Sequence, residues 1–595
     1  MSLFRDLLID KRKRRYYCEV EYLEASGTQY INTGLLSTAQ SKVDVVYGFS
    51  NMASGATNNC AIFGGRSSST YTVNTFTMFK LASASPQAFR FDYNTQKSIA
   101  TASNMAWNTT SKYRMTYNGS RAQVTNITTG ETAGLDMNPA ESYTTTPIAI
   151  FAVNTMGAVG QNMKGRIYKF WYTDGTNTVD LIPVLDWNLT PCMYDRIGDK
   201  FFYNAGTGSF TYGREIHYVD YLEADGTQYI DTGVYLTNNH SVEIDYQLTV
   251  ASQSRKGLYG GLATSRHGAL LSPSNQYLEA GYGAGNDYYQ LGLPDTNRHT
   301  FKQEKNKLYF DGVLTHTFNT AIFTQNFTAP LGNFNYTNYT PASAKYYSSK
   351  WWENTTLIRD YKPAIDENGV GYMFDGVTHS CFLNAGTGDF KYPARQTEYL
   401  QTTAIGANID LGIKYKSSMS IKLKYMRDSQ GDSGSVLPLS NNTTPPLIYF
   451  PALNASAKTD RFVWRRTGYT EQRQDITFTS YPMADQEIYL DAVNDKLYIN
   501  DTEVKSGMIA GMGGYTSPYE SSSNLQMLSI NGSYCGLGKI YYVQLYDTTQ
   551  VYRDLVPAWK DGQFGMYDKE NDVLYQNNKT AGTIVSGKIV ESKYE

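Results

Sequence analysis

Short segments in which apolar and polar residues alternate run through most of the chain. Residues 41–49 (SKVDVVYGF), 240–250 (HSVEIDYQLTV) and 418–426 (SMSIKLKYM) are examples. On a strand, this period of two places one set of side chains inward and the other outward. Residues 306–312 (NKLYFDG) and 495–504 (DKLYINDTEV) add a strand–turn–strand pattern around Asp-Gly and Asn-Asp. Because helical periodicity is nearly absent beyond the first 14 residues, the pattern predicts an all-β protein.

Two phrases recur along the chain and divide it into modules. Residues 22–34 (YLEASGTQYINTG) and 221–233 (YLEADGTQYIDTG) agree at eleven of thirteen positions. Residues 398–412 (EYLQTTAIGANIDLG) are a more distant copy with one extra residue. A closing series repeats as well, and in the first two copies it ends in NAGTG, at 204–208 and 384–388. Recurrence of both phrases in the same order predicts tandem copies of one structural unit.

The repeats predict an N-terminal anchor, helical or extended, at 1–17 and three modules at 18–214, 215–394 and 395–595. Each module has the size of a single domain. Many short strands with evenly spaced turns predict a two-sheet β-sandwich, or jelly roll, for each of them. The NAGTG phrase precedes a predicted strand and lacks a following Lys-Ser/Thr, so we interpret it as a turn rather than a phosphate-binding loop.

The composition narrows the class of partner. The 595 residues carry a net charge of −3 and only 18% are charged, whereas Gly (50) and Tyr (51) are abundant. Such a chain suits strands joined by turns. Its charge argues against a nucleic-acid or anionic-membrane partner, since binding of backbone phosphates needs clustered cations. No run of about 20 apolar residues is present, so no membrane-spanning helix is predicted.

The opening phrase, its copy and the closing MYD…NAGTGSF series together resemble a known family. They are similar to the concanavalin-A-like (laminin-G-like) jelly-roll modules of tailed phages of gut bacteria, crAss-like phages among them, and of surface proteins of their hosts. The resemblance covers all three modules, although the third lacks the GTQY of the opening phrase. It implies the fold more than the function, because this fold carries lectins, protein-binding modules, glycosidases and spacers.

A glycosidase is the enzyme class that the resemblance brings into question. Some jelly-roll glycosidases place paired carboxylates on one strand as Glu-x-Asp-x-x-Glu or Glu-x-Asp-x-Glu, with one acting as nucleophile or base and the other as acid. Glu243 and Asp245 match the first two positions, but Gln247 and Leu248 stand where the acid is required. We therefore interpret Glu243 and Asp245 as solvent-facing positions of an alternating strand and predict that the protein is not an enzyme.

Neither cysteines nor histidines form a metal-binding motif in the sequence. The five cysteines are scattered without a CxxC pair, so neither a disulfide framework nor a zinc site is predicted. All six histidines lie in the second module without HxH or HxxxH spacing, and only the fold could gather them into a site. No cofactor is expected, although a structural Ca²⁺ ion is compatible with the many Asp and Asn residues of the loops.

Aromatic side chains in the variable middle of a module are the candidates for glycan binding, because sugar C–H faces pack on aromatic rings. Trp107 lies in MAWNTTSKYRMTYNG of the first module. Trp464 lies in RFVWRRTGYTEQR of the third, next to Arg465 and Arg466. These four residues are the glycan-binding candidates.

The first 17 residues differ in character from the rest of the chain. An apolar set is followed by a basic run, and the two together are the predicted anchor: Leu3, Phe4, Leu7, Leu8, Lys11, Arg12, Lys13, Arg14 and Arg15. A secretory signal is not expected, since Arg5, Asp6 and Asp10 break the apolar patch and the basic residues follow it. A nuclear-localisation or nucleic-acid segment and a membrane-surface helix are alternatives, and we favour a peg that docks into a larger assembly.

The expected function is that of a non-enzymatic phage virion protein. It would be a head or tail fibre or decoration protein, anchored in the particle through other virion proteins and displaying lectin-like modules to host or mucin glycans. A homo-oligomer, a trimer by analogy with fibres, is expected, and display in many copies would strengthen individually weak contacts. A carbohydrate-binding surface protein of a bacterium or prophage is the first alternative, and a glycan-active hydrolase is the second.

Overall fold

The computed structural model describes most of the chain and shows only β-strands there. The residues described are 17–50, 60–69, 74–81, 88–94, 96–100, 107–137, 144–186, 188–251, 253–262, 265–272, 277–284, 287–319, 321–402, 407–416, 418–427, 439–440, 447–454, 459–465, 472–477, 485–507, 520–528, 538–547, 550–560, 563–578 and 584–586. Within these ranges no helix occurs, which confirms the all-β prediction. The predicted anchor lies outside them, except for Tyr17. By its internal contacts the chain divides into two compact units, Met1–Tyr392 and Pro393–Glu595.

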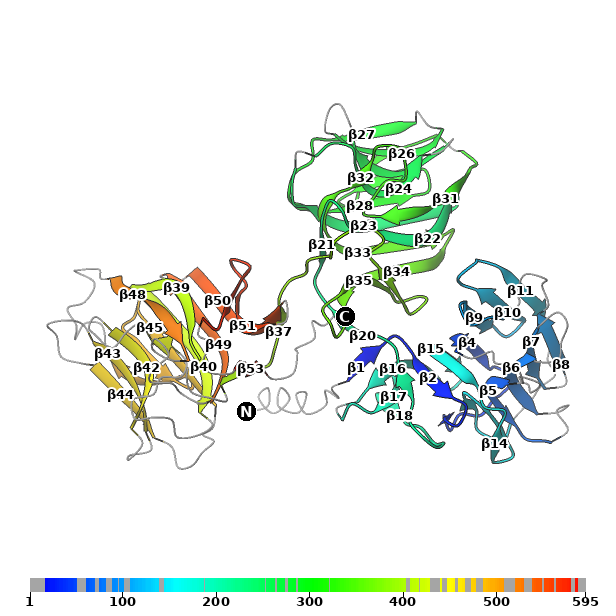
Figure 1. The fold of residues 1–595 in the computed structure, drawn as a ribbon, viewed down its shortest axis with the longest axis horizontal. Coiled ribbons are helices and arrows are strands. Elements are labelled where there is room, and N and C mark those ends of the chain that lie inside the picture. Colours follow the sequence, from blue (N-terminus) through cyan, green and yellow to red (C-terminus); the bar gives the residue numbers. More distant parts are fainter. Residues whose placement is uncertain are drawn as a thin grey trace. The chain divides into compact units, whose positions relative to one another are not determined.

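The first module is a sandwich of two sheets (Figure 1). One sheet follows the order β11 (Thr132–Asp136), β10 (Arg121–Asn126), β9 (Lys112–Tyr117), β4 (Lys42–Phe49), β15 (Lys164–Thr173), β16 (Thr178–Leu185), β17 (Pro191–Asp195) and β18 (Lys200–Phe202). Added to it are β2 (Leu23–Ser26) beside β15, β19 (Thr211–Tyr212) beside β2, and β1 (Cys18–Val20) beside β16. The second sheet contains β3 (Ile31–Asn32), β12 (Ala149–Ile150), β5 (Cys60–Arg66), β6 (Thr75–Leu81), β7 (Ala88–Tyr93), β8 (Gln96–Ala100), β13 (Val153–Thr155) and β14 (Ala158–Gly160).

The second module repeats this plan. Its first sheet follows the order β30 (Val313–Thr317), β29 (Lys307–Phe310), β28 (Arg298–Glu304), β23 (His240–Leu248), β33 (Ser343–Glu353), β34 (Thr356–Ile365), β35 (Gly371–Asp375) and β36 (Ser380–Leu383), with β21 (Leu222–Asp225) beside β33 and β20 (Glu215–Tyr218) beside β34. The second sheet contains β22 (Ile230–Thr237), β31 (Thr324–Leu331), β24 (Lys256–Leu262), β25 (Ser265–Leu271), β26 (Leu278–Ala284), β27 (Tyr288–Gly292) and β32 (Thr340–Pro341).

The third module has the same strand order. Its first sheet follows the order β47 (Thr502–Ser506), β46 (Lys496–Ile499), β45 (Gln486–Asp491), β40 (Met419–Arg427), β49 (Gly538–Asp547), β50 (Gln550–Lys560), β51 (Gln563–Asp568) and β52 (Val573–Gln576), to which β37 (Arg395–Gln396), β38 (Leu400–Thr402) and β53 (Ile584–Ser586) are added. The second sheet contains β39 (Ile409–Lys416), β48 (Glu520–Met527), β41 (Leu439–Ser440), β42 (Leu447–Asn454), β43 (Thr459–Arg465) and β44 (Gln472–Thr477). The sequence repeat is therefore a structural repeat of two-sheet β-sandwiches.

The alternating segments occupy one equivalent place in each module. They form β4, β23 and β40, and each of these strands pairs along its length with the long strand of the closing series. The inward positions of β23 and β40 are buried and the outward ones are partly exposed, which confirms the period of two. The predicted turns are also present, since Asp311 and Gly312 have φ of 49° and 76°, and Asn500 and Asp501 have φ of 49° and 63°. Positive φ at both central residues suits the twist of a tight hairpin.

Aromatic side chains fill much of the core of the first two modules. In the first, the rings of Tyr47, Phe89 and Tyr113 lie 5.1–6.1 Å apart, centroid to centroid. In the second, Trp351 is completely buried between Tyr259 and Tyr361, and its indole N–H donates to Ser349. Edge-to-face ring contacts of this kind add to the free energy of burial. The abundance of tyrosine in the composition is thus explained partly by core packing.

The two repeated phrases are hydrogen-bonded to each other. In the first module the buried amide of Gln29 accepts from the Ser26 N–H (2.9 Å) and donates to the Ser209 carbonyl oxygen (3.0 Å). Asn204 of NAGTG accepts from the Tyr30 N–H at 3.2 Å and donates to the Gly208 carbonyl oxygen at 2.8 Å. NAGTG is therefore a turn, as the sequence predicts, and the structure shows in addition that it closes the module onto its own opening phrase.

The same connection is present in the second module and, in reduced form, in the third. Gln228 accepts from the Asp225 N–H at 2.8 Å, and Asn384 accepts from the Tyr229 N–H at 3.1 Å. The third module lacks GTQY, but the Asn408 N–H there donates to the Asn577 side chain at 3.0 Å. The opening loop of the third module therefore keeps the backbone contact and loses the glutamine.

Replacement of Gln29 by alanine should lower the unfolding free energy of the first module by about 1–2 kcal/mol, because two partly buried hydrogen bonds to the backbone are lost. Urea unfolding, monitored through hydrogen exchange of the backbone amides in β2 and β19, would measure the loss of unfolding free energy. Gln40→Ala is the matched control, since Gln40 is exposed on a loop of the same module. Equal protection of β2 in both variants would contradict a structural role for the glutamine.

Candidate functional site

The first and second modules are joined edge to edge through their opening strands. β1 pairs with β16 of its own module on one side and with β20 of the second module on the other. β20 in turn pairs with β34, so one 21-stranded sheet runs through both modules. The pairing is symmetrical, since Glu19 lies opposite Val184 in one module as Tyr218 lies opposite Ala364 in the other. This continuity explains why residues 1–392 form one compact unit.

A cleft of about 400 Å³ opens beside this junction and is lined by both modules. Its volume lies within the range of small-molecule and sugar sites. Its lining combines hydroxyl, charged and aromatic side chains. The first module contributes Glu21, Gly48, Phe49, Thr109, Thr110, Ser111, Lys112, Ile127, Thr128, Arg166 and Tyr168, and the second contributes Asp231, Thr232, Gly233, Arg359, Thr378, Ser380, Cys381 and Phe382.

Lys112, at the start of β9, connects the two walls of the cleft. Its ammonium group donates to the Ser380 hydroxyl (2.7 Å) and to the His379 carbonyl oxygen (3.2 Å), and lies 3.5 Å from the Glu21 carboxylate. It also lies 3.5 Å from the centre of the Tyr168 ring. Burial lowers the pKa of Lys112 from 10.5 to about 8, although the Glu21 carboxylate acts in the opposite direction. The ammonium group is thus held by contacts from both modules.

Arg166 continues the wall of the first module along β15. Its guanidinium donates to the Glu24 carboxylate at 2.8 Å and lies over the Tyr22 ring, 4.5 Å from the centroid. Both partners belong to the repeated opening phrase. The phrase therefore shapes one side of the cleft, although it contributes no reactive group.

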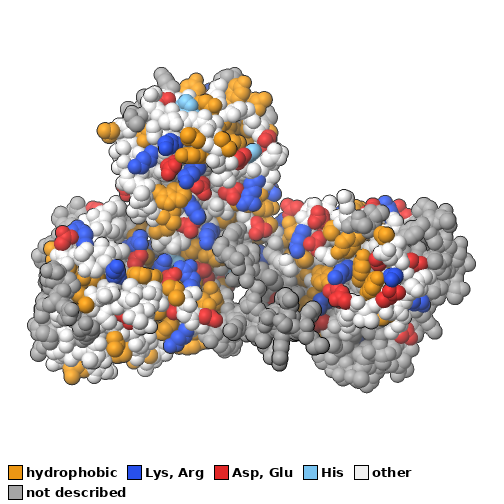
Figure 2. Space-filling view, turned by 180° about the vertical axis from the view of Figure 1, so that it is seen from behind, with side chains coloured by type: hydrophobic (Ala, Val, Ile, Leu, Met, Phe, Trp, Pro, Cys, Tyr) orange, Lys and Arg blue, Asp and Glu red, His pale blue; other side chains and the backbone are white. Residues whose placement is uncertain are grey.

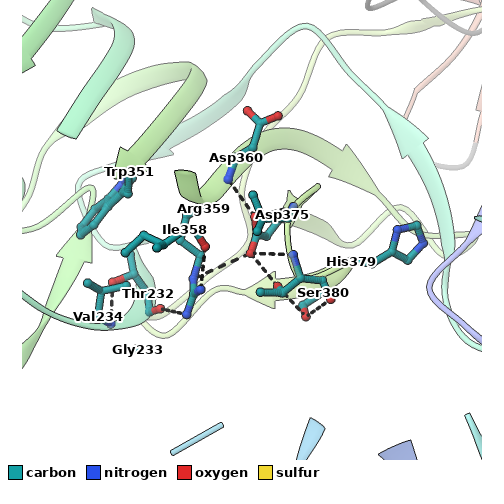
Figure 3. Close-up of polar contacts among 12 residues, drawn as sticks. Thr232, Gly233, Val234, Trp351, Ile358, Arg359, Asp360, Asp375, His379 and Ser380 are labelled. Carbon is teal, nitrogen blue, oxygen red and sulfur yellow. Dashed lines mark hydrogen bonds and ion pairs between the residues drawn. The ribbon is translucent and has the colours of Figure 1, made fainter. Parts of the chain in front are cut away.

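Arg359 forms the wall of the second module, on β34 (Figure 3). It donates to the carbonyl oxygens of Ile358 (2.8 Å) and Thr232 (3.4 Å). Its Nε lies 3.8 Å from Oδ2 of Asp375, a fully buried carboxylate. Figure 3 shows Arg359 between Thr232 on β22 and Asp375 on β35, so the guanidinium links β22 of the second sheet to the closing strands.

The charges around the cleft are already paired, which favours binding over catalysis. Glu21 pairs with Lys112, and the Asp231 carboxylate accepts from the Gly233 N–H at 3.1 Å. Burial raises the pKa of the Cys381 thiol well above its usual range, so this thiol stays protonated. What the cleft offers a ligand is therefore hydroxyl groups and the partly exposed ring of Phe382 beside neutralised ion pairs, an arrangement suited to sugars.

The residues predicted from sequence as glycan contacts lie elsewhere. Trp107 is only 4% exposed, packs on Phe49 and lies under the Lys80 ammonium at 3.8 Å, so its faces are covered by protein. We therefore leave it out of the candidate site. Trp464 and Arg465 end β43 in the third module, and Arg466 falls outside the described residues. The anchor candidates, Leu3 to Arg15, fall outside them as well.

Glu243 and Asp245, the two carboxylates that match part of the glycosidase pattern, each form an ion pair with a cationic side chain. Both lie on the outward face of β23, as the alternation predicts. Asp245 accepts two hydrogen bonds from Arg298, at 2.6 and 2.8 Å, and Glu243 lies 3.7 Å from Lys302. These contacts fit a surface ion-pair role on a strand.

Sequence reasoning missed Lys112, Arg166 and Arg359, the cations of the cleft. Lys112 and Ser380 are 268 positions apart, and nothing local signals their contact. The one available signal was the repeat itself: Arg166 and Arg359 both lie in the closing series that the modules share. The basic residues of the closing series could therefore have been considered together as candidates for one binding site.

On the face of each module that Figure 2 shows, charged side chains of both signs are interspersed among the described residues. Among the described residues, no helix is long and apolar enough to cross a membrane.

Comparison with known proteins finds likeness in structure rather than in sequence. No protein-family model and no curated protein matches the chain. Among solved structures it is similar to the LG1-3 region of the laminin α2 chain, with 10% identity and a TM-score of 0.24 over 95% of this chain and 100% of that one. Mouse laminin α1 domains LG4-5 have 9% identity and a TM-score of 0.20, over 61% of this chain and 94% of that one.

A sialidase is a further structural neighbour. The Trypanosoma rangeli sialidase in complex with sialic acid has 10% identity and a TM-score of 0.20, over 82% of this chain and 91% of that one. At such TM-scores these likenesses carry no argument about function. The sheets themselves identify the chain as a tandem array of two-sheet β-sandwich modules, of which the first two share a polar, aromatic-lined cleft.

Proposed function

We propose that the chain is a non-enzymatic structural protein that binds an oligosaccharide in the cleft between its first two modules. The observation that carries the proposal is the lining of that cleft, in which the partly exposed ring of Phe382 accompanies threonine and serine hydroxyls. Aromatic faces pack on the C–H faces of sugars, and hydroxyl groups exchange hydrogen bonds with them. The ion pairs of Lys112 and Arg359 hold the walls in place, so the site is pre-organised.

The finer proposal is a phage virion fibre or decoration protein whose residues 1–17 dock into the particle. It rests on the resemblance of the repeated phrases and on the apolar-then-basic order of these residues. Incubation of fibre-stripped particles with the full chain, and with a chain that lacks residues 1–17, tests this part. Equal attachment of both would contradict docking through the N-terminus.

Blocking the cleft should abolish glycan binding without unfolding the protein. Thr110 is exposed at the rim, and Thr110→Arg places a long side chain across the opening. On a glycan array the variant should bind the ligands of the wild-type chain more than about tenfold more weakly, a loss of at least ~1.4 kcal/mol. Thr176→Arg, on an exposed loop outside the cleft lining, should bind like the wild type.

Two results would contradict the proposed site. Equal binding by Thr110→Arg and the wild type would place the sugar elsewhere. Absence of wild-type binding to every glycan of a host-derived and mucin-derived array would leave a scaffold role without a sugar ligand.

A further inference from the structure

Three potential metal ligands from different parts of the sequence converge at the junction of the first two modules. The Cys18 Sγ lies 3.8 Å from the Glu215 Oε2 and 3.9 Å from each ring nitrogen of His217. The His217 Nε2 lies 2.8 Å from the same Glu215 oxygen. One donor atom from each residue falls within 4.8 Å of the others, and all three side chains are partly buried.

The strand pairing determines this convergence. β1 and β20 run antiparallel with Glu19 opposite Ile216 and Val20 opposite Glu215, a register that places Cys18 opposite His217. Glu215 and His217 are two positions apart on β20, so their side chains share one face of the sheet. Because β16 and β34 pair with β1 and β20 on their outer sides, the backbone under the three donors is held by four strands.

The donor set and its spacing fit Zn²⁺. Thiolate, imidazole and carboxylate are its usual protein ligands, and tetrahedral coordination at normal bond lengths separates such donors by roughly 3.3–3.6 Å. The observed donor–donor separations of 2.8–3.9 Å lie on either side of this range. Small side-chain rotations that move the donor atoms by a few tenths of an ångström would bring all of the separations into it. A thiolate and a carboxylate also supply the two negative charges that neutralise the ion.

The convergence distinguishes a metal site from a nucleophile–histidine–carboxylate triad. In such a triad the histidine stands between the nucleophile and the carboxylate, which do not meet. Here the Cys18 thiol lies as close to the Glu215 carboxylate as to the imidazole, so all three donors surround one point.

We propose that Cys18, Glu215 and His217 bind a Zn²⁺ ion that links the first module to the second, with the fourth position left to water. Cys18 comes from the first module and the other two from the second, so the ion would clamp the two opening strands together. Cys18 and His217 each precede the tyrosine of the opening phrase by four residues, and in the third module this position is Arg395. The site is therefore specific to the junction of the first two modules.

The full chain, reduced and stripped of metal with a chelator, provides the test. Titration with Zn²⁺ should show one tight site per chain, and Co²⁺ should produce a thiolate-to-cobalt charge-transfer band. Cys18→Ala and His217→Asn should each weaken Zn²⁺ binding by at least about tenfold, and Cys18→Ala should abolish the band. Cys60→Ala is the matched control, since Cys60 is also a partly buried free cysteine but lies outside the three-donor cluster and the cleft lining, and it should bind Zn²⁺ like the wild type.

A second measurement needs no variant and so does not depend on variant folding. Zn²⁺ should slow alkylation of Cys18 in the wild-type chain, because a metal-bound thiolate is withheld from the reagent, whereas Mg²⁺ should have no effect. Equal Zn²⁺ affinity in wild type and Cys18→Ala, or alkylation of Cys18 that Zn²⁺ leaves unchanged, would overturn the proposal. The three side chains would then be a His–Glu ion pair beside a thiol.

Discussion

Replacement of Asp375 by alanine is expected to lower the unfolding free energy of the second module by about 3–5 kcal/mol. The carboxylate is completely buried and accepts from the N–H groups of Asp360 (2.8 Å) and Val377 (3.1 Å) and from the Thr378 hydroxyl (2.6 Å). It is also the counter-ion of Arg359, which is 12% exposed (Figure 3). Alanine would leave a partly buried cation and three backbone donors, the third being the Thr378 N–H at 3.4 Å, without their acceptor, which is the most costly way to break such a network.

Urea unfolding followed by hydrogen exchange in peptides from β34 and β35 would measure this loss, with the third module as an internal reference. Asp389→Ala removes an exposed carboxylate from the same module and should change the unfolding free energy little. Asp375→Asn keeps one carbonyl acceptor, so its loss of unfolding free energy should lie between those of Asp375→Ala and Asp389→Ala. A loss below about 1 kcal/mol for Asp375→Ala would show that Arg359 and the backbone donors find other partners.

The same aspartate recurs in the closing series of all three modules. Asp195 accepts from the Asp180 N–H at 2.9 Å, and Asp568 lies 3.1 Å from the Arg553 Nε. The repeated MYD, MFD and MYD tripeptides are thus explained by a buried acceptor that holds the closing hairpin. This is a structural role, and it accounts for part of the repeat without any catalytic chemistry.

Acidification from pH 7 to 4.5 is expected to destabilise the second module by roughly 2–3 kcal/mol through His267 alone. Burial lowers the pKa of His267 from 6.5 to about 3, helped by the nearby His240. The folded module therefore keeps this ring neutral, whereas the unfolded chain takes up a proton below pH 6.5. The unfolding free energy is unaffected by this ring above pH 6.5 and falls as the pH drops from 6.5 towards 3.

His267→Phe should remove this part of the acid sensitivity. The ring is enclosed by Tyr259, Tyr282 and Phe323, and neither of its nitrogens has a hydrogen-bond partner among the described residues. Phenylalanine fits this aromatic surrounding without buried polar atoms, so the variant should be at least as stable as wild type at pH 7. Unfolding curves of both proteins, measured between pH 7 and 4.5, should show that the unfolding free energy of His267→Phe depends less on pH than that of the wild type.

His299→Gln is the control of opposite sign. Burial lowers the pKa of His299, but hydrogen bonds to Asp311 and Asp295 outweigh it and raise the pKa above 6.5. The stabilisation from this ring is complete below pH 6.5 and is lost as the pH rises through the raised pKa. Its removal should therefore steepen the loss of stability on acidification. Identical pH dependence in wild type, His267→Phe and His299→Gln would contradict both assignments.

The placement of all six histidines in the second module has no single cause in the structure. His240 is buried on β23 of the first sheet, and His267 is buried on β25 of the second sheet. His379 is buried against the Val20 carbonyl oxygen of the first module, and His217 belongs to the three-donor cluster. His316 stacks on Tyr289 with 4.4 Å between ring centres. The prediction that only the fold could gather histidines into a site applies to His217 alone, and its partners there are a cysteine and a glutamate.

The amino-acid sequence by itself determined the strands, the turns and the three-fold repetition of the module. These depend on local patterns, namely the period of two in segments such as 240–250, positive-φ residues such as Gly312, and phrases that recur intact. Each such signal is contained within about ten residues, and it reports how a strand faces its own core. Even the mutual contact of GTQY and NAGTG could have been anticipated, because the two phrases are kept or changed together.

Only the tertiary structure decided which modules meet and which side chains share a site. The pairing of β1 with β20 brings Cys18 to His217 across 199 positions, and the cleft brings Lys112 to Ser380 across 268. It also decided that Trp107 lies in the core, although its sequence surroundings are polar. Edge strands present unpaired backbone groups whatever their side chains are. The partner of an edge is therefore determined by the geometry of the folded modules, and no local pattern records it.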